Sequence, residues 1–467
     1  MKTSELFNKI CQSAQKCGYE IYVVGGYVRD QILKIKGKDI DFVVVGDAMA
    51  FADQLKKDFR LRKIVRYPRF GTFMISYYGY QLEFVNARAE SYNKDSRNPV
   101  TEQADLKSDL SRRDFTINAM AMPICPEVDR NIIDIFGGLQ DLKNGIIRTP
   151  LDPIQTFSDD PLRMMRAVRF ACRFNFKIET NTLNAIKSAA ERIQIVSQER
   201  ITDEFNKILI SDKPSVGLNL LDQTGLLQMI LPEVVAMKGI EQKKKYHHKD
   251  VFYHTLEVLD NIALNTQEIN LRLAALFHDV GKPRTKKFDD ENGWTFHGHE
   301  VVGERMVKKI LSRMRYSIDA IEYVQKLTNL HLRPMALVNE EVTDSAVRRL
   351  IFAAGDQIDD LMMLCRADIT SKNPGKVERY LKNYDNVVKK IAEVEERDQL
   401  RNFQPPVNGN EIMDMFGLDP GPVVGQIKKF VEEAILNGDV PNEHDACVEL
   451  INRNKEKFQS AGSGTSP

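Results

Sequence analysis

Two aspartates, two positions apart, are the first residues in the chain whose types and spacing predict chemistry. Asp39 and Asp41 open the apolar run 42–45, which is typical of a β-strand. In a strand, residues i and i+2 point to the same face, about 7 Å apart along the chain. Such carboxylates would hold a pair of Mg²⁺ ions roughly 4 Å apart, which activate an attacking hydroxyl and stabilise a leaving pyrophosphate. A solvated strand start is the alternative.

A glycine pair precedes these aspartates and indicates an anion site. Gly25 and Gly26 lie where a strand-like run ends and a helix is expected to begin. Glycine lets the backbone approach a phosphate closely, and a helix N-terminus favours negative charge, although a plain tight turn has the same signature. Arg29 falls in the first turn of that helix, within reach of the same anion. Glu83, in a later strand, is a candidate third metal ligand or a solvated side chain.

A third group of polar residues follows Asp152 on a predicted helix. Steps of three place on one broad helical face Asp160, Arg163, Arg166 and Arg169. A carboxylate beside a guanidinium offers an acceptor and planar donors, which together imitate the Watson–Crick edge of a base. Surface ion pairs are the ordinary alternative for this spacing.

The eight histidines are confined to the second half of the chain. None precedes His247, and seven lie between His247 and His331, so chemistry in the first half does not use histidine. Imidazole nitrogens and carboxylates suit divalent transition metals as well as Mg²⁺. The side chains available in or just after this cluster are His254, His278, Asp279, His297, His299, His331 and Asp368.

The elements that must position these residues change character along the chain. Residues 1–150 mix strand-like runs at 21–24, 42–45, 73–75 and 82–85 with helical segments, and beyond Asp152 amphipathic helix predominates. The polar stretch 241–250 and the Pro pair and Asn-Gly turn within 401–410 indicate boundaries, and the segment 460–467 resembles a disordered end. We therefore expect an α/β head followed by a long helical body, in two to four domains.

Composition narrows the class of protein. Hydrophobic residues make up 42% and charged residues 28%, and the formal net charge is zero, so any RNA surface must be a local patch. No apolar run reaches the roughly 20 residues of a membrane span, and the N-terminal segment resembles an amphipathic helix rather than a signal peptide. Six scattered cysteines without a CxxC pair predict reduced thiols in a cytoplasmic protein.

Four motifs of the first half together resemble a known family. VVGGYVRD, KDIDFVVVGD, the block SRRDFTINAMAM around Arg113, Asp114 and Asn118, and the helix SDDPLRMMRAVRF are similar to segments of class II tRNA nucleotidyltransferases and bacterial poly(A) polymerases, members of the DNA polymerase β superfamily. The match spans residues 20–175. It implies a DNA polymerase β-like sheet with helices in the head, an all-α remainder, and Mg²⁺ at the aspartates.

The resemblance also implies how the nucleotide is selected. Asp160 and Arg163 would pair with the base of the incoming CTP or ATP, and Arg166 and Arg169 would support the base or the phosphates. This chain has Asp159 before Asp160 where the family usually has Glu, a conservative departure. The polar segment between Arg88 and Ser111 is expected to be the mobile loop that the family uses to switch from C to A addition, and its length favours complete CCA addition.

The histidine segment carries a second resemblance. The order H…HD…D, with HDVGKP intact, is similar to the HD superfamily of metal-dependent phosphohydrolases. It implies one divalent metal (Mg²⁺, Mn²⁺, Ni²⁺ or similar) bound by His254, His278, Asp279 and Asp368. His299 and His331 would then hold a second metal or a phosphate.

The tail beyond residue 408 resembles that of bacterial HD-containing tRNA nucleotidyltransferases, and Lys428 and Lys429 would face tRNA phosphates. Together the resemblances imply a head at 1–150, a neck at 151–240, an HD domain at 241–375, a tRNA-binding body at 376–460 and a disordered end at 461–467. The predicted activity is template-independent CCA addition to the tRNA acceptor end from CTP and ATP, with no membrane or obligate protein partner. Two alternatives remain: a poly(A) polymerase or partial (A- or CC-adding) enzyme, and an HD phosphohydrolase with a non-catalytic RNA-binding head.

Overall fold

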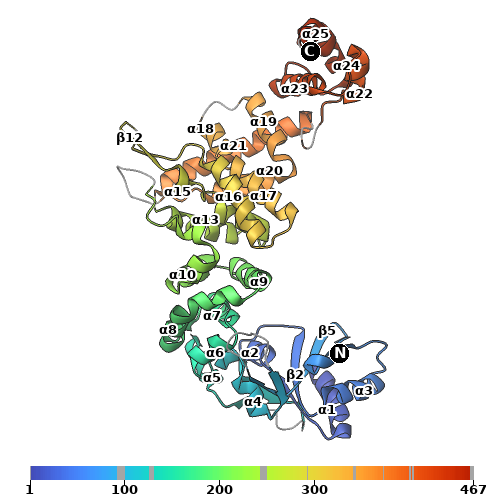
Figure 1. Cartoon of the computed structure of the whole chain (residues 1–467), viewed down its shortest axis with the longest axis vertical. Helices are drawn as coiled ribbons and strands as arrows, with labels where there is room; N and C mark the ends of the chain where they lie inside the picture. Colours follow the sequence, from blue (N-terminus) through green and yellow to red (C-terminus); the bar gives the residue numbers. More distant parts are fainter. Residues whose placement is uncertain are drawn as a thin grey trace. The chain divides into compact units, whose positions relative to one another are not determined.

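The computed structural model describes residues 2–91, 100–125, 131–241, 250–291, 293–339, 343–371, 373–398, 401 and 404–462. The chain forms two compact units, residues 1–232 and 233–467. The first contains a mixed sheet with helices and the second is mostly helical (Figure 1), which confirms the predicted fold class. The polar segment 242–249, part of the predicted boundary at 241–250, lies outside the described residues.

The first unit is built on a seven-stranded sheet with the strand order β3-β4-β5-β2-β1-β8-β9. The four strand-like runs expected from the sequence all lie in this sheet. Its strands are β1 (Glu20–Val24), β2 (Asp39–Val45), β3 (Val65–Tyr67), β4 (Thr72–Tyr77), β5 (Tyr80–Asn86), β8 (Met120–Pro123) and β9 (Ile133–Asp134). The helices of this part are α1 (Thr3–Cys17), α2 (Gly26–Ile32), α3 (Ala48–Asp58), α4 (Leu106–Ser111) and α5 (Gly138–Asn144).

The core of the head holds β2 in place through alternating burial. Ile40 and Phe42 are fully buried, whereas Asp39 and Asp41 are exposed on the opposite face. The ring of Phe42 stacks on that of Phe84 with their centroids 4.5 Å apart, and Phe84 stacks on the next strand's phenylalanine. Alternation in the sequence therefore decides that both aspartates share one face of the sheet.

The segment predicted to be a mobile loop between Arg88 and Ser111 is more ordered at its ends than expected. Strand β6 (Arg88–Ser91) pairs antiparallel with β7 (Val100–Gln103), and α4 follows. Backbone hydrogen bonds between β6 and β7 explain why these residues are ordered although their side chains show no apolar periodicity. Residues 92–99 lie outside the described residues.

The rest of the first unit is helical, apart from one short parallel pair of strands. Its elements are β10 (Ile146–Ile147), α6 (Pro153–Asp159), α7 (Leu162–Phe174), β11 (Lys177–Ile178), α8 (Thr180–Ala189), α9 (Gln198–Leu209), α10 (Pro214–Gln223), α11 (Leu226–Ile230) and, at the unit boundary, α12 (Pro232–Val235). The expectation of one helix carrying Asp160 with the three arginines is wrong. Asp160 is extended (φ −139°, ψ 101°) because Pro161 disfavours helical geometry in the residue before it.

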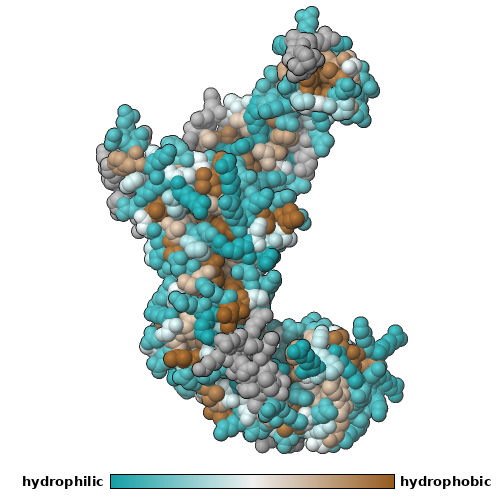
Figure 2. Space-filling model, in the orientation of Figure 1, coloured by the Kyte–Doolittle hydropathy of each residue, from teal (hydrophilic) through white to brown (hydrophobic). Residues whose placement is uncertain are grey.

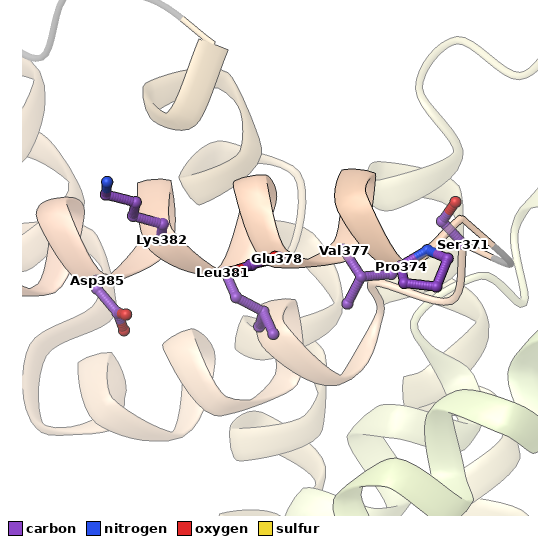
Figure 3. A pocket seen from close by; sticks show the side chains of 7 residues that line it. All are labelled: Ser371, Pro374, Val377, Glu378, Leu381, Lys382 and Asp385. Atoms are coloured by element: carbon purple, nitrogen blue, oxygen red, sulfur yellow. The ribbon is translucent and has the colours of Figure 1, made fainter.

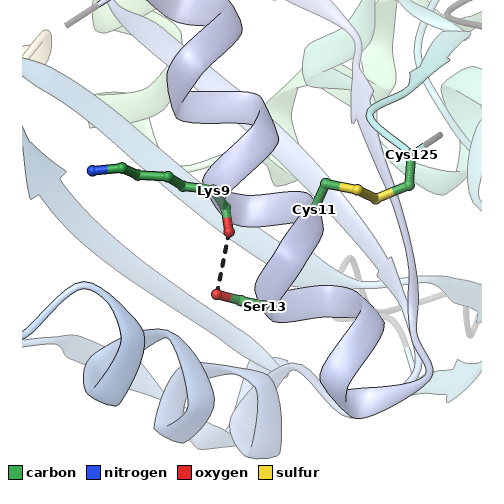
Figure 4. The surroundings of a disulfide bond; sticks show 4 residues. All are labelled: Lys9, Cys11, Ser13 and Cys125. Carbon is green, nitrogen blue, oxygen red and sulfur yellow. Dashed lines mark hydrogen bonds between the residues drawn. A yellow bond between two sulfur atoms is a disulfide. The ribbon is translucent and has the colours of Figure 1, made fainter. Parts of the chain in front are cut away.

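One pair of cysteines corrects the prediction that all the thiols are reduced. Cys11 on α1 and Cys125, just beyond β8, form a disulfide with their Cα atoms 5.5 Å apart (Figure 4). The two residues are 114 positions apart in sequence, so only the packing of α1 beside the sheet brings them together. The other four cysteines are free thiols.

The second unit is a set of packed helices with one short hairpin. Its first part contains α13 (Val251–Ala263), α14 (Ile269–Phe277), α15 (Lys282–Thr285), β12 (Lys287–Asp289), β13 (Gly293–Thr295), α16 (His299–Arg313), α17 (Ile318–Leu330), α18 (Arg333–Asn339), α19 (Asp344–Ala354) and α20 (Ile358–Ala367). It continues with α21 (Pro374–Asp398), α22 (Gly409–Phe416), α23 (Pro422–Asn437), α24 (His444–Arg453) and α25 (Lys455–Gly462). Residues 463–467 of the expected disordered end lie outside the described residues.

Hydrophilic residues predominate on the face drawn in Figure 2, where hydrophobic residues form small separate patches. Among the described helices, none has the length and apolar character needed to cross a membrane.

Candidate active site and metal centre

Three carboxylates gather on the exposed face of the head sheet. Strand β2 runs parallel to β5 and places Asp41 opposite Glu83, while its antiparallel pairing with β1 places Asp41 opposite Val24. Asp41 is accessible at the surface, yet its pKa is raised, chiefly because neighbouring residues of the head desolvate the carboxylate. The charge of Asp39 also raises this pKa, and the charge of Arg113 opposes the shift. Burial and the charge of Asp41 raise the pKa of Glu83. The three acidic groups therefore repel one another, which fits a site for cations.

The glycine turn lies beside this carboxylate group, because Gly25 directly follows Val24. Gly25 has a φ of 66°, and a Cβ built there would lie 2.8 Å from Arg113 Nη1. The positive φ favours glycine at this position, whereas the contact with the end of the Arg113 side chain could be relieved by movement of that side chain. Helix α2 starts at Gly26 and is seven residues long. The arrangement brings a backbone turn, a guanidinium and the carboxylates to the same part of the head.

Arg29 does not extend into solvent from this turn. It is buried, donates from Nη1 to Asn118 Oδ1 at 2.6 Å, and forms an ion pair with Asp30 at 2.7 Å. Its guanidinium also lies over the rings of Phe170 and Phe174, at 5.1 and 4.9 Å. Burial lowers the pKa of Arg29, but a guanidinium stays charged. Arg29 thus links the glycine turn to helix α7.

Asn118 continues this link to the arginines of α7. Its amide donates to Asp114 Oδ1 at 2.9 Å, and Asp114 Oδ2 accepts two hydrogen bonds from Arg166, at 2.6 and 2.8 Å. Burial opposes ionisation of Asp114, but Arg166 and Asn118 lower its pKa to about 2. A continuous chain of hydrogen bonds therefore joins Arg29, through the amide of Asn118 and the carboxylate of Asp114, to Arg166 on α7.

The remaining residues of the predicted recognition group have separate partners. Arg169 forms an ion pair with the buried Glu204 at 2.6 Å, and Arg163 donates to the carbonyl oxygen of Arg112 at 2.6 Å. Asp160, just before α7, forms an ion pair with Arg200 at 3.1 Å. The three arginines lie on α7, whereas Asp160 lies just before it.

Two carboxylates that organise this site were missed by the sequence reasoning. Asp109 is fully buried and forms ion pairs with Arg112 and with Arg113, the latter at 2.9 Å. Glu204 is also buried and pairs with arginines of α7. An acidic residue at an apolar position of a helix is the available signal, because a buried carboxylate requires a partner. Both hold the arginines in position.

The second unit brings together all six predicted metal-site residues. His254 lies within α13, whereas the others lie at or beside helix ends: His278 and Asp279 after α14, His299 at the start of α16, His331 after α17 and Asp368 after α20. Their potential ligand atoms form two groups, the first of His254, His278 and Asp368 and the second of Asp279, His299 and His331. The five residues other than Asp368 are at least nine-tenths buried.

Electrostatics in this cluster are strongly perturbed. Burial alone would lower the pKa of His278. The negative charges of Asp279 and Asp368 outweigh this effect and raise the pKa to about 9. Burial and neighbouring His278 lower the pKa of His331 to about 3. Although burial opposes its ionisation, His278 and Lys282 hold the pKa of Asp279 well below the ordinary value.

Two buried atoms of the cluster, His278 Nε2 and Asp279 Oδ1, make no hydrogen bond. Unpartnered polar atoms among buried imidazoles and carboxylates fit a bound cation, which would displace any proton on His278 Nε2. His297, in contrast, is exposed.

A pocket of about 680 Å³ lies elsewhere in the second unit, along one side of α21 (Figure 3). Its lining mixes apolar with charged side chains: Ser371, Pro374, Val377, Glu378, Leu381, Lys382 and Asp385. None of these is a predicted site residue, so the pocket adds nothing to either cluster.

Comparison with known proteins agrees with the arrangement of both units. Residues 21–148 match the poly A polymerase head domain, residues 175–237 the probable RNA and SrmB-binding site of polymerase A, and residues 251–371 the HD domain. The structure is similar to the crystal structure of the Bacillus stearothermophilus CCA-adding enzyme in complex with CTP. The TM-score is 0.68 at 23% identity, covering 98% of this chain and 100% of that one, which shows the shared fold.

Relatives of higher identity carry the family assignment. The A-adding tRNA nucleotidyltransferase of Deinococcus radiodurans is 33% identical over 74% of this chain and 79% of the relative. The CCA-adding enzyme of Levilactobacillus brevis is 31% identical over 96% of this chain and 97% of the relative. By this similarity, and by its matches to the head, the RNA-binding segment and the HD domain, the chain belongs to the tRNA nucleotidyltransferase family that carries a poly(A) polymerase-type head and an HD domain.

Proposed function

We propose that this chain adds CCA to the 3′ end of tRNA from CTP and ATP without a nucleic-acid template. The observation that carries the proposal is the register of the head sheet, which sets Asp41 beside Glu83 and next to the Gly25 turn. Relatives named for CCA addition and for A addition support the substrate. The tRNA acceptor end, CTP and ATP are the proposed partners.

Asp39, Asp41 and Glu83 are the proposed catalytic residues of the head, with the two aspartates as Mg²⁺ ligands. Their mutual repulsion favours a divalent cation, and exposed carboxylates are the ligands that Mg²⁺ prefers. When bound, Mg²⁺ would activate the 3′ hydroxyl and stabilise the pyrophosphate that leaves. The sheet contributes by holding the carboxylates on one face before any nucleotide arrives.

Nucleotide binding is proposed for the turn and the neck. We assign the triphosphate to the turn and its neighbours, and the base to the residues at and before α7. Arg29, being buried, would act by joining the two regions. The complete proposed set is Gly25, Gly26, Arg29, Arg113, Asp114, Asn118, Asp160, Arg163, Arg166 and Arg169.

The test uses tRNA that lacks its CCA end, incubated with CTP, with ATP and with both, followed by sequencing of the products. CCA on the product of the combined reaction is the expected result. Asp39→Ala should lower incorporation at least about 10²-fold because it removes a metal ligand. Asp53→Ala, at an exposed head aspartate paired with Arg66, is the matched control and should retain activity. Full incorporation by Asp39→Ala would reject the metal assignment.

Addition of the terminal A alone is the second candidate, favoured by the 33% identity to an A-adding enzyme. The same reactions separate the two. An A-adding enzyme extends tRNA ending in CC with ATP and leaves tRNA without CC unchanged in CTP. Adenosine tails on unrelated RNA would instead indicate a poly(A) polymerase.

For the second unit we propose a divalent-metal centre of the phosphohydrolase type. Its ligands would be His254, His278, Asp279 and Asp368, since their orphaned atoms and close approach support a cation. When bound, the metal would supply a nucleophile toward a phosphoester. His278→Ala should abolish any metal-dependent phosphoester cleavage while CCA addition continues. We propose the cytoplasm as the location of both activities.

A further inference from the structure

We propose that the hairpin of β12 and β13 binds a single strand of RNA by stacking a base on Phe288, beside Trp294. This hairpin lies outside the segment 175–237 that matches an RNA-binding model, and it contains none of the residues proposed above for nucleotide or metal binding. The binding therefore goes beyond CCA addition and beyond the phosphohydrolase centre, and it requires neither activity.

The hairpin exposes an aromatic side chain that the core does not use. In Figure 1 it extends away from the packed helices of the second unit, and all three residues of β12 are exposed. Phe288 is 46% exposed, although phenylalanine is among the residues most often buried in proteins. Burial in the core therefore does not account for this ring.

Phe288 and Trp294 form one aromatic surface. They are directly opposite each other in the antiparallel pair, so their side chains lie on the same face of the hairpin. Their ring centroids are 5.1 Å apart and the ring planes meet at 76°. Such an edge-to-face pair stabilises the hairpin but covers only part of each ring. The exposed part of Phe288 is a surface on which a base can stack.

Basic side chains accompany the aromatic pair. Lys286 Nζ lies 4.3 Å from the centre of the Trp294 ring, and Arg284 and Lys287 are exposed in the same segment. Aromatic rings interleaved with cations bind single-stranded nucleic acid, because bases stack on the rings and phosphates pair with the cations. An apolar protein surface would offer these cations no opposite charge. The combination therefore favours RNA as the partner.

The distribution of charge along the hairpin gives the bound strand a direction. Asp289, Asp290 and Glu291 are exposed at or next to the turn, where they repel phosphate. At the other end of the segment, Lys282 pairs with Asp279 of the histidine cluster at 2.6 Å. A strand stacked on Phe288 would thus extend from the aromatic pair toward the basic end, beside that cluster.

The test uses the fluorescence of Trp294, which is the only tryptophan in the chain and therefore reports on this hairpin alone. The full-length protein is titrated with a short oligoadenylate RNA strand, and separately with ribose 5-phosphate, a probe that has no base. Neither metal nor nucleoside triphosphate is present, so the result is independent of both proposed activities. Oligoadenylate should quench Trp294 to saturation, less tightly at higher salt, and ribose 5-phosphate should not.

Variants separate stacking from the packing of the hairpin. Phe288→Leu keeps an apolar side chain against Trp294 but has no aromatic face. The emission of Trp294 in the RNA-free variant should stay close to that of the wild type, whereas the affinity for oligoadenylate should fall at least about fivefold. Phe288→Tyr should restore the affinity. Lys286→Gln should weaken binding and reduce the slope of log affinity against log salt by about 0.7. Tyr78→Ala, at an exposed aromatic residue of the head, is the matched control and should bind like the wild type.

Absence of quenching by oligoadenylate, or equal quenching by ribose 5-phosphate, would overturn the proposal. Wild-type affinity in Phe288→Leu, or equally weak binding by Phe288→Leu and Phe288→Tyr, would contradict base stacking. A change of Trp294 emission with protein concentration alone, with no response to RNA, would assign the aromatic pair to a contact with a second copy of the chain.

Discussion

Single side chains connect the two halves of the proposed nucleotidyltransferase site. Asn118 is buried between Arg29 and Asp114 and uses its oxygen for one and its amide nitrogen for the other. An amide is the side chain that donates and accepts at once. Asn118 therefore bridges the Arg29 guanidinium and the Asp114 carboxylate.

Asn118→Ala should disrupt both regions. It would leave a buried guanidinium and a buried carboxylate each short of a hydrogen bond, at a cost of about 2 kcal/mol in the free energy of unfolding. Nucleotide incorporation should fall at least about tenfold, because the turn and α7 lose their connection. Urea unfolding and the kcat/KM for CTP measure the two effects. Asn219→Ala, an exposed helix position, is the control, and similar behaviour of the two variants would contradict the role.

Asp114 predicts a dependence of stability on pH. Its folded-state pKa of about 2 is below the ordinary value of about 3.9, so ionisation stabilises the fold by about 2.6 kcal/mol. The contribution is fully present above the ordinary pKa and is lost as pH falls from about 4 toward about 2. The stability difference between the wild type and Asp114→Asn should therefore narrow over that range. Urea unfolding at pH 5, 4 and 3 measures it, and a constant difference would contradict the shift.

At the scale of elements, helix ends decide where the proposed metal ligands lie. Helices α14, α16, α17 and α20 each end or begin beside the cluster. The turn after α14 passes so close to α16 that a Cβ at Gly281 would lie 2.1 Å from His299 O and 2.8 Å from Gly303 N. Glycine is required at this position by packing, because the obstructing atoms are backbone.

Gly281→Ala should displace α16 and, with it, His299. The overpacking is expected to lower the free energy of unfolding by about 1–3 kcal/mol and to weaken metal binding in the second unit. Gly425→Ala, within α23 and with open space around the added methyl group, is the matched control and should be slightly more stable than the wild type. Thermal unfolding and metal titration check the pair. Unchanged metal affinity in Gly281→Ala would contradict a contribution of α16 to metal binding.

At the scale of the whole molecule, the disulfide closes a long segment of the head. Cys11 and Cys125 are 114 residues apart, so the chain-entropy model gives a stabilisation of up to about 4–5 kcal/mol. Reduction, or Cys11→Ser, should therefore lower the melting temperature of the head. Thiol titration of the denatured chain should give four reactive cysteines before reduction and six after. Six without reductant would show that the bond is absent in solution.

Metal should stabilise one unit only. All the proposed HD ligands lie in residues 233–467, so Ni²⁺ at 100 times its Kd should raise the stability of that unit by about 2.7 kcal/mol. Differential scanning calorimetry of the Asp39→Ala/Asp41→Ala chain, which lacks the proposed head ligands, should show one transition moving with Ni²⁺ and the other unchanged. His278→Ala should abolish the movement. A shift of both transitions would contradict a site confined to the second unit.

The sequence by itself determined the fold class, four of the seven strands of the head sheet and the motifs that carry the family resemblance. Alternating apolar residues predict a strand and its faces, so the shared face of Asp39 and Asp41 follows from local periodicity. The order of the histidine motifs likewise indicated a metal centre. These properties depend on short stretches of chain.

Only the tertiary structure decided which distant residues meet. The pairing of Asp41 with Glu83, the burial of Arg29 beneath Asn118, the roles of Asp109 and Glu204, and the disulfide all join residues far apart in sequence. The interruption of the helix before Pro161 is a local property of the sequence, but the helical spacing of the charged residues around it predicted one continuous helix. The division of the six candidate ligands into two groups beside Asp279 depends on the packing of several helix ends, which periodicity within any one helix does not encode.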